Sequence, residues 1–590
     1  MDWLAPSELR IGLGCMRLST DADRDPERAG ATIAAAAAAG ITVFDTAHAY
    51  GRDQSDCGHN ERLLATALRG CGAEGTARIV TKGGMTRESG GWVPDGRAKA
   101  IRAHCEASLA ALDGLPIDTY LLHAPDPRTP WSTSVRALAR LHADGLVARI
   151  GLSNVNRHQL DEALALAPIG AVQVALSIVD DGALRGGLVE RCAERGIALI
   201  AHSPLGGPRR TAALARCEEL ARVAWQHGAE PAEVALAWLL SLSPTVVAIP
   251  GARRPETARS AARAAALTLT ESDRAALRPD RAALRPDRAA LRPDHAARPT
   301  GPVPGAEAVM IMGIPGAGKT HAAQEYVARG YERLNRDERG GSLRGIAQAL
   351  DERLASGTHR VVLDNTYLTR AARSHVIEIA GRRGAAVRCL WVNTPLAQAQ
   401  VNMVSRLIDL FGAVPSPEEL RDLARSTEGV MAPTSQMRAL RELEPPAPDE
   451  GFSEVQEIPF ARVVRDQRGG GGVLVAAPAL EQAGWEEAVA GAAPTVPHLI
   501  FDWRPGGDPD VLGPSAAALR SVAAGPVEHA ICPHEGGPPR CWCRPPLPGL
   551  ALAFAARHGL ALTRSVVIGS GPAHRTLANA LGARHVPVVA

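Results

Sequence analysis

Several residues that together could reduce a carbonyl group lie at the ends of successive strand-like runs. Asp45 ends one short apolar run, Tyr50 follows in the next loop, and Lys82 and His123 come directly after two later runs. Hydride addition to a carbonyl carbon leaves negative charge on the oxygen, which requires a proton and a hydrogen bond. We therefore expect Tyr50 to donate the proton and His123 to hydrogen-bond the oxygen. Lys82, held in place by Asp45, would lower the pKa of the phenol.

Eight strand-like runs alternate with helical stretches across the first 278 residues. They span residues 11–14, 41–46, 78–82, 118–123, 149–153, 171–176, 197–202 and 245–249. This alternation predicts a closed (β/α)8 TIM barrel, whose active site lies at the C-terminal ends of the strands. A doubly wound open sheet is the alternative, but no glycine-rich dinucleotide fingerprint opens the chain. Asp45, Lys82 and His123 would thus meet at one rim of the barrel.

The chain is too long for a single hydrophobic core. Its 590 residues, 46% of them hydrophobic, and its formal net charge of +2 suit three or four globular domains. The small net charge gives no overall field for nucleic acid or for a membrane. We expect a cytoplasmic protein with reduced thiols, because we find no signal peptide and no apolar run long enough to span a bilayer.

Short motifs spread over residues 1–278 carry a family resemblance. They are Phe44–Gly51, Asn60-Glu61 with Leu63-Leu64, Thr81–Gly84, Leu121–Asp126, Ile150–Asn154, Val172-Gln173, Ser203–Gly207 and Ile249–Arg253. In this order and spacing they resemble the aldo-keto reductases. The resemblance implies one barrel domain over residues 1–278 that reduces a small carbonyl substrate with NADP(H), and it implies the roles given above to the four polar residues.

The same resemblance implies a set of cofactor-binding residues. They are Ser153, Asn154 and Gln173 at the nicotinamide, Leu205 and Gly206 at the pyrophosphate, Arg253 and Arg254 at the adenosine 2′-phosphate, and Ser203 and Gly251 beside them. The two arginines would favour NADPH over NADH. The sequence departs from the family after Gln173, where Val174 replaces a common Asn, and at Ser260-Ala261, where a Glu-Asn pair is common.

A proline-rich repeat separates this domain from the next. The heptad Asp-Arg-Ala-Ala-Leu-Arg-Pro occurs three times within residues 273–293, and a degenerate copy follows. The first copy would form the last helix of the barrel, with a capped start before it. Because proline at every seventh position prevents a continuous helix, we predict a semi-stiff linker at 279–305. An arginine stripe that binds nucleic acid is disfavoured, since each repeat balances Arg with Asp.

The domain expected at 306–465 opens with a phosphate-binding loop. The apolar run Val309–Met312 leads directly into Gly313-Ile-Pro-Gly316-Ala-Gly318-Lys319-Thr320, which is the Gly-x4-Gly-Lys-Thr pattern between a strand and a helix. The glycines let backbone N–H groups cradle phosphates. Lys319 would reach the β- and γ-phosphates, and Thr320 would ligate Mg²⁺. The sequence therefore predicts a parallel-sheet domain that binds ATP.

Two further motifs indicate what this domain phosphorylates. Asn335–Arg339, and the strand-like run Val361–Leu363 that ends in Asp364, resemble polynucleotide 5′-hydroxyl kinases. The resemblance implies that Asp337 is the general base for the acceptor hydroxyl and that Asp364 lies near the metal. The partner would then be a nucleic-acid 5′ end.

The kinase resemblance is incomplete at the acceptor site and at the lid. An arginine expected to contact the acceptor phosphate is Gly340, and the first lid arginine is Val401. Arg406, one place late, would be the remaining lid arginine at the nucleotide. Two alternatives follow from these departures: a kinase for a sugar or polyol, and an ATP-binding module without phosphoryl transfer.

The last segment, expected at 496–590 after a Gly/Ala-rich linker at 466–495, carries a cluster of metal-ligand residues. The four candidate ligands are Cys532, His534, Cys541 and Cys543. Their types and number are those of a closed, structural Zn²⁺ site. Together with Arg544–Gly549 and Val566–Ser570, this loop resembles the zinc-loop branch of the haloacid-dehalogenase-type phosphatases.

The catalytic residues of that phosphatase family do not survive in this segment. The nucleophile motif meets Asp502-Trp-Arg504-Pro505, in which an arginine replaces the second acid. A lysine is replaced by Pro545, and no acid follows Gly569 within Ser570–Ala573. Because an aspartyl-phosphate enzyme needs these groups, we predict an inactive phosphatase-like domain.

Taken together, these patterns predict a multidomain α/β enzyme. An NADPH-dependent carbonyl reductase would be followed by an ATP-dependent kinase and by a small zinc-holding, phosphatase-like domain. The partners would be a small carbonyl compound and a nucleic-acid 5′ end, with no membrane. The sequence does not identify the natural carbonyl substrate or the oligomeric state.

Overall fold

The computed structural model describes residues 3–88, 91–207, 210–211, 214, 216–277, 305–427, 429–461, 469–537 and 539–588. Its contacts divide the chain into two units, Met1–Ala297 and Arg298–Ala590. The predicted linker at 279–305 lies outside the described residues except for Gly305. Within the described ranges, no helix is both long and apolar enough to cross a membrane.

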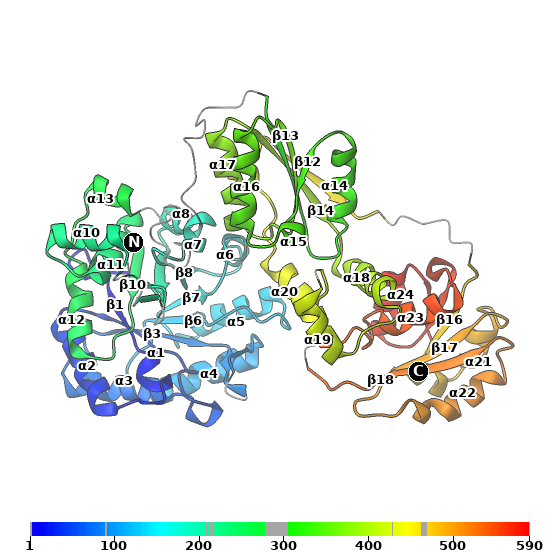
Figure 1. Cartoon of the computed structure of the whole chain (residues 1–590). Helices are drawn as coiled ribbons and strands as arrows, with labels where there is room; N and C mark the ends of the chain where they lie inside the picture. The colour runs from blue at the N-terminus through cyan, green and yellow to red at the C-terminus, as the bar shows by residue number, and fades with distance from the viewer. Residues whose placement is uncertain are drawn as a thin grey trace. The chain divides into compact units, whose positions relative to one another are not determined.

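The first unit is a closed barrel of eight parallel strands (Figure 1). The strands are β1 Gly12–Gly14, β2 Val43–Asp45, β3 Arg78–Gly83, β6 Thr119–Leu122, β7 Arg149–Ser153, β8 Ile169–Ala175, β9 Ala198–His202 and β10 Val246–Ile249. They pair in chain order, and bridges from Ile11 to Ala248 and from Gly14 to Gly251 close the circle. The predicted barrel is confirmed, and the open sheet is ruled out.

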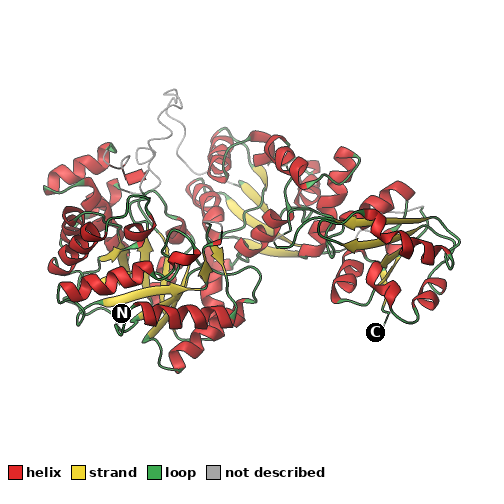
Figure 2. Ribbon diagram, turned by 90° about the horizontal axis from the view of Figure 1, so that it is seen from below, coloured by secondary structure: helices red, strands yellow, loops and turns green. Residues whose placement is uncertain are grey.

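Helices surround the strands of this barrel (Figure 2). They are α1 Met16–Thr20, α2 Pro26–Ala38, η1 Gln54–Asp56, α3 His59–Gly70, α4 Ala98–Ala111, α5 Trp131–Ala143, α6 Arg157–Leu164, α7 Gly182–Arg185, α8 Leu188–Glu194, α10 Glu218–His227, α11 Pro231–Leu242, α12 Pro255–Ala264 and α13 Glu271–Ala276. Helix α13 begins at the predicted cap, where Thr270 and Asp273 form a reciprocal capping box. A short hairpin, β4 Met85–Thr86 and β5 Val93–Pro94, follows β3.

Alternating side chains of the strands fill two apolar layers. Val43, Val80 and Leu121 belong to one buried cluster, together with Ile200 and Val247 of later strands. Their chain neighbours pack into a second, larger cluster with the surrounding helices. This period of two is what a strand with both faces covered requires. It fixes the side of the barrel to which each polar strand-end residue points.

The second unit begins with a five-stranded parallel sheet in the order β12-β13-β11-β14-β15. Its strands are β11 Glu307–Met312, β12 Glu332–Leu334, β13 Arg360–Asp364, β14 Ala386–Asn393 and β15 Glu454–Pro459. Its helices are α14 Lys319–Ala328, α15 Arg336–Arg339, α16 Leu343–Ala355, α17 Arg370–Arg382, α18 Leu396–Phe411, α19 Pro417–Ser426, α20 Pro433–Glu442 and η5 Pro448–Glu450. Separate apolar clusters cover the two faces of the sheet.

A second five-stranded parallel sheet follows in the same unit, in the order β18-β17-β16-β19-β20. Its strands are β16 Val473–Ala476, β17 His498–Trp503, β18 Val527–Cys532, β19 Val566–Ile568 and β20 Arg584–Val586. Its helices are η6 Ala477–Glu481, α21 Trp485–Ala490, η7 Pro509–Leu512, α22 Gly513–Arg520, α23 Gly549–His558, η8 Leu562–Arg564 and α24 Pro572–Leu581.

The central strand of this second sheet corrects the expected linker at 466–495. Strand β16 lies inside that range, pairs with both β17 and β19, and is fully buried. Four glycines precede it and Pro478 follows closely. Glycine and proline are typical of loops, so the sequence pattern predicted a linker where the structure has a four-residue strand.

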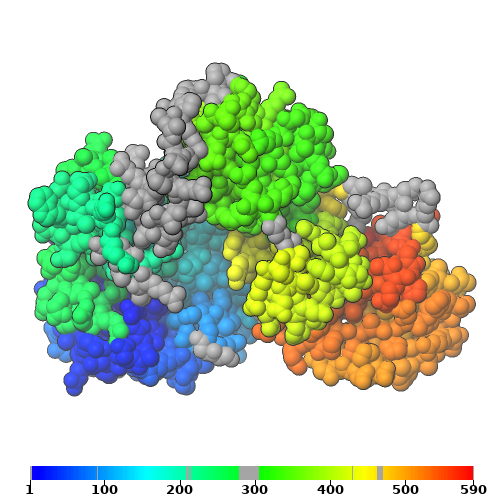
Figure 3. Space-filling view, in the orientation of Figure 1, coloured from blue at the N-terminus to red at the C-terminus, as the bar shows by residue number. Residues whose placement is uncertain are grey.

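The two sheets of the second unit share an apolar cluster. Met403, Val404 and Leu407 of α18 pack with Leu420 of α19 and with Trp542, from the loop between β18 and α23. Figure 3 shows the yellow α18–α19 residues against the orange and red residues of the later sheet's domain. The indole N–H of Trp542 also donates to the Met431 carbonyl at 3.1 Å. The two sheets are therefore joined by buried contacts.

The barrel leaves no space for a side chain at Gly151 in β7. A Cβ on Gly151 would lie 2.3 Å from the Ala171 carbonyl oxygen and 2.6 Å from Leu121 Cδ2. We expect Gly151→Ala to lower the free energy of unfolding of the barrel by about 1–3 kcal/mol, through overpacking, and the melting temperature by several degrees. Gly30→Ala is the control, because that helical glycine has nothing within 4 Å. An unchanged melting temperature for Gly151→Ala would contradict the packing described here.

Candidate functional site

A buried ion pair lies at the C-terminal mouth of the barrel. The Lys82 ammonium is 2.7 and 2.8 Å from the carboxylate oxygens of Asp45 and 2.8 Å from the Thr46 carbonyl oxygen. Lys82 and Asp45 are 1% and 2% exposed. Burial has the largest single effect and lowers the pKa of Lys82, but the Asp45 carboxylate and the Tyr50 phenol together outweigh it, and the pKa is raised above its ordinary value. The lysine is therefore held as a cation.

Tyr50 joins this pair through its phenol oxygen. Lys82 Nζ donates to Tyr50 Oη at 3.0 Å and lies 4.7 Å from the ring centre. Because the lysine is the donor, the phenol O–H is free to donate elsewhere. Burial raises the pKa of Tyr50 above its ordinary value even though Lys82 opposes the rise. Lys82 thus lowers the pKa of the phenol as expected, but burial outweighs the lysine and the net shift is upward.

His123 lies beside the phenol. The two ring centres are 5.7 Å apart, at an interplanar angle of 77°. Burial holds the pKa of His123 well below its ordinary value, and Lys82 and His202 lower it further. His123 Nδ1 is buried and has no hydrogen-bond partner among the residues that the structure describes. The imidazole is therefore neutral near pH 7 and can donate one hydrogen bond without carrying charge.

A pocket of about 720 Å³ opens above these residues. The predicted residues that line it are Asp45, Tyr50, His123, Ser153, Asn154, Gln173, Ser203, Leu205, Gly251, Arg253 and Arg254. Lys82 is absent from this lining, and so is Gly206, whose neighbour Gly207 lines the pocket instead. The structure thus brings almost the whole predicted set together.

Gln173 makes a contact that the sequence did not predict. Its side-chain amide donates to Asp45 Oδ2 at 2.6 Å, across 128 residues of chain. Asn154, in turn, donates to the His123 carbonyl oxygen at 3.0 Å. Two predicted cofactor residues therefore also support two of the predicted catalytic residues.

His202 and Trp92 are two residues near the phenol that sequence reasoning missed. His202 ends β9 and lines the pocket, and burial lowers its pKa to about 4. Its place at the end of a barrel strand could have identified it. The Trp92 ring, on the loop between β4 and β5, lies 6.0 Å from the Tyr50 ring and 5.9 Å from the His123 ring. No sequence pattern marks Trp92.

The phosphate-binding loop has the predicted strand-to-helix setting. It runs from the end of β11 to the start of α14, which Gly318 caps in the left-handed region. Gly313 and Gly316 also have positive φ angles, of 152° and 82°. A Cβ on Gly316 would lie 2.5 Å from the Ala399 carbonyl oxygen, so the loop requires glycine there for space as well as for conformation. Thr320 is exposed in the first turn of α14.

Lys319 lies folded over this loop. Its ammonium donates to the Ile314 carbonyl oxygen at 3.0 Å. Burial lowers the pKa of Lys319 to about 8, while the charges of Asp364 and Asp337 oppose that effect. Among the described residues, no carboxylate lies within ion-pair distance of the Lys319 ammonium, which leaves this cation available to an anionic ligand.

The two predicted acids of this domain differ in their surroundings. Asp364 ends β13 and is buried against Arg333, whose Nη2 lies 2.5 Å from its carboxylate. Asp337 is exposed on α15, with Arg336 Nη2 at 3.3 Å. Asp364 is thus already neutralised by an arginine, whereas Asp337 is accessible to an acceptor.

Helix α18 explains the missing lid arginine. Arg406 is exposed on it, and Asn402 donates to the Gly316 carbonyl oxygen at 2.8 Å. Val401, where an arginine was expected, packs instead against the apolar cluster of the second sheet that contains Leu577 and Leu581. An arginine at this partly buried position would lie against that apolar cluster.

The four candidate metal ligands converge. Cys532 Sγ lies 3.4 Å from His534 Nδ1 and 3.6 Å from Cys541 Sγ, and Cys543 Sγ lies 3.2 Å from His534 Nδ1. All four ligand atoms lie within 4.8 Å of one another. Tetrahedral zinc with Zn–S bonds of about 2.3 Å separates two sulfurs by roughly 3.7 Å. The residues therefore fit a closed Zn²⁺ site.

Asp502, the acid assigned to the degenerate nucleophile motif, lies on the wrong strand for that role. It is in β17, whereas the strand order reverses between β16 and β19. Ligands of open parallel sheets bind at such a reversal. Arg504 Nε also donates to Asp502 at 2.6 Å. Strand β16 ends in Ala476 followed by Ala477, neither of which offers an acid.

Comparison with protein families gives two matches. Residues 10–279 match the model described as "Aldo/keto reductase family", and residues 309–407 match one described as "AAA domain". The chain is 31% identical over 273 residues to aldo-keto reductase str7 of Strobilurus tenacellus, covering 41% of this chain and 78% of that protein. It is 32% identical over 297 residues to probable aldo-keto reductase 1 of Glycine max, covering 45% and 83%.

Parts of the chain are also similar to solved structures. A thermostable aldo-keto reductase, Tm1743, bound to epalrestat, is 33% identical with a TM-score of 0.40, covering 45% of this chain and 93% of that one. An aldo/keto reductase of Klebsiella pneumoniae in complex with NADP and acetate is 26% identical with a TM-score of 0.40, covering 45% and 89%. Through residues 10–279, the chain belongs to the aldo/keto reductase family.

Proposed function

We propose that the barrel reduces an aldehyde or ketone with NADPH and that Tyr50 donates the proton. The observation that carries this proposal is the single ammonium of Lys82, which binds Asp45 and Tyr50 together under one pocket. A charged lysine at 3.0 Å stabilises the phenolate that remains after the proton has left. The raised pKa of Tyr50 keeps the proton in place until a carbonyl oxygen gains negative charge.

Each polar residue of the mouth has a part in this reduction. When bound, NADPH supplies a hydride to the carbonyl carbon. The phenol O–H of Tyr50 gives its proton to the carbonyl oxygen, which converts the carbonyl to an alcohol, and Lys82 holds the resulting phenolate. Neutral His123 donates a hydrogen bond to the same oxygen and so orients the substrate. Trp92 forms an apolar wall beside them.

The pocket suits a nicotinamide dinucleotide. Asn154, Gln173, Arg253 and Arg254 line the same pocket as Tyr50. Amide side chains can bind the carboxamide of the nicotinamide, and guanidinium groups can bind the phosphates of the cofactor. Family membership supports the same assignment.

For the second unit we propose an ATP-dependent kinase that acts on a polynucleotide 5′-hydroxyl. The loop of three positive-φ glycines, with Lys319 at the N-terminus of α14, supports nucleotide binding. Thr320 would bind Mg²⁺ there. Exposed Asp337 is available as the base, with Arg336 and Arg339 beside it for an anionic acceptor. A sugar or polyol kinase is the second candidate.

The last sheet is proposed to be a phosphatase-like scaffold that holds one structural Zn²⁺. The four convergent ligands support the metal site. The arginine-paired Asp502, and the lack of acids at the end of β16, support the absence of phosphatase chemistry.

Replacing the phenol tests the reductase. We expect Tyr50→Phe to lower kcat for a generic aromatic aldehyde about 100- to 10,000-fold, measured as NADPH consumption, because the general acid is lost. Tyr120→Phe is the matched control, since that phenol is buried and donates to the Ile101 carbonyl oxygen, away from the pocket lining. Turnover by Tyr50→Phe above a tenth of the wild-type rate would remove Tyr50 from this role.

Labelled ATP tests the kinase and its acceptor. With γ-labelled ATP we expect transfer to a 5′-hydroxyl oligonucleotide, reduced at least about 100-fold in Lys319→Met, because the phosphate-binding cation is gone. Exposed Lys99→Met in the barrel is the control. Transfer only to a polyol panel would support the second candidate. ATP binding without transfer to either would leave a binding module.

Metal analysis tests the cysteine-rich loop. We expect about one zinc per chain, lost together with several degrees of melting temperature in Cys541→Ser, because a structural metal contributes to folding. Cys71→Ser is the control, because Cys71 is exposed and free. A wild-type chain without zinc, purified without chelator, would argue against the site.

A further inference from the structure

Arg253, the residue proposed to bind the cofactor's 2′-phosphate, is already engaged by two carboxylates. Its Nη2 lies 2.7 Å from Asp23 Oδ1, and its Nη1 lies 3.2 Å from Asp21 Oδ2. Nη2 also donates to the Asp23 carbonyl oxygen at 3.3 Å. Asp23 lines the same pocket as Arg253. An anion arriving at this arginine therefore meets two negative charges.

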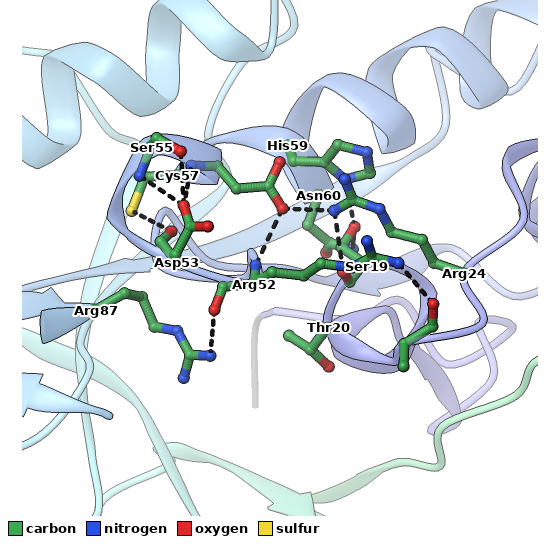
Figure 4. Close-up of polar contacts among 12 residues, drawn as sticks. Ser19, Thr20, Arg24, Arg52, Asp53, Ser55, Cys57, His59, Asn60 and Arg87 are labelled. Atoms are coloured by element: carbon green, nitrogen blue, oxygen red, sulfur yellow. Dashed lines mark hydrogen bonds and ion pairs between the residues drawn. The ribbon is translucent and has the colours of Figure 1, made fainter. Parts of the chain in front are cut away.

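Both acids lie between α1 and α2, on a short segment named here the acidic strap, which comprises residues 19–25 and so includes the last two residues of α1. Contacts with residues other than Arg253 hold the strap in place. Figure 4 shows those made by Ser19 and Arg24 of the strap and by Arg52 of the loop after Tyr50. Ser19 Oγ is 2.8 Å from His59 Nδ1 and accepts from the Asn60 amide at 2.7 Å. These bonds limit how far the strap can move.

The strap is also tied to the loop that follows the catalytic tyrosine. Arg24 pairs with Asp56 and donates to the Ser19 carbonyl oxygen at 3.2 Å. Arg52, two residues after Tyr50, donates to the Ala22 carbonyl oxygen at 2.6 Å. Asp21 is also paired with Arg17 at 2.7 Å. The carboxylates of the strap therefore stay close to Arg253 even if a ligand breaks their ion pairs.

We propose that Asp21 and Asp23 set the cofactor preference of the barrel by competing with the 2′-phosphate of NADPH for Arg253. The inference depends on the proposed function. A phosphate monoester carries nearly two negative charges near pH 7, and carboxylates held beside its site repel it. A ribose 2′-hydroxyl, by contrast, can donate a hydrogen bond to a carboxylate, which is how acidic residues favour NADH.

The consequence is a dinucleotide site that accepts both cofactors. Arg253 and Arg254 attract the phosphorylated form, and the strap acids offset that attraction. Because these side chains are partly exposed, the competition weakens as salt increases. The preference for NADPH over NADH is therefore smaller than the two arginines alone would give.

The test compares Asp23→Asn and the double variant Asp21→Asn/Asp23→Asn with the wild type. Dissociation constants for NADPH and NADH are measured by quenching of protein fluorescence at low and high salt. We expect the double variant to bind NADPH about tenfold more tightly at low salt, with NADH binding unchanged or weaker. The gain should shrink at high salt. Asp113→Asn is the control, since Asp113 pairs with Arg69 and is 82% exposed, away from the pocket lining.

The possible results distinguish failure of the role proposed for the strap from failure of the proposed reductase. An NADPH-to-NADH affinity ratio that stays within twofold of wild type in the double variant overturns the role of the strap and leaves the reductase intact. A similar change in Asp113→Asn would assign the effect to net charge and would also overturn it. A folded wild-type chain that binds neither dinucleotide overturns the proposed function and this inference with it.

Discussion

The contact between the Lys82 ammonium and the Asp45 carboxylate is the constraint on which the barrel site depends. Removing two charges from water costs several kcal/mol per ion, and the pair is stable only if the remaining hydrogen-bonding capacity is satisfied. Here Asp45 accepts from Lys82 and from Gln173, and Lys82 also donates to Tyr50 and to the Thr46 backbone. Loss of one partner would leave the other as an uncompensated buried charge. Tyr50, Gln173 and the Thr46 backbone supply those remaining hydrogen bonds.

The second unit uses its lysine differently. Among the described residues, the Lys319 ammonium donates to the Ile314 carbonyl oxygen of its own loop, and burial lowers its pKa to about 8 although the charges of Asp364 and Asp337 oppose that effect. A cation that is only partly satisfied gains from an arriving phosphate, whereas Lys82 is saturated by its neighbours. One lysine is thus built to bind an anion and the other to hold a phenol.

Sequence patterns predicted most of the barrel and most of its site. All eight strands lie within two residues of their expected ends, because buried parallel strands are apolar throughout and the chemistry falls at their C-terminal ends. The contacts of Gln173 with Asp45 and of Arg253 with Asp23 could not be predicted, since each joins residues more than 100 positions apart. The strand Val473–Ala476 was missed because four apolar residues are too few to show an alternating pattern of side chains, and the glycines before them are typical of a loop.

The indole of Trp542, packed into α18 and α19, has a practical consequence for anyone who divides this chain. A fragment that stops before β16 would keep the nucleotide loop but would uncover Met403, Val404 and Leu407, which Trp542 now shields from water. Such contiguous apolar surface promotes aggregation. Expression of the nucleotide-binding part alone should therefore give insoluble material, and the natural cut for soluble fragments lies near residue 297, where the two units separate.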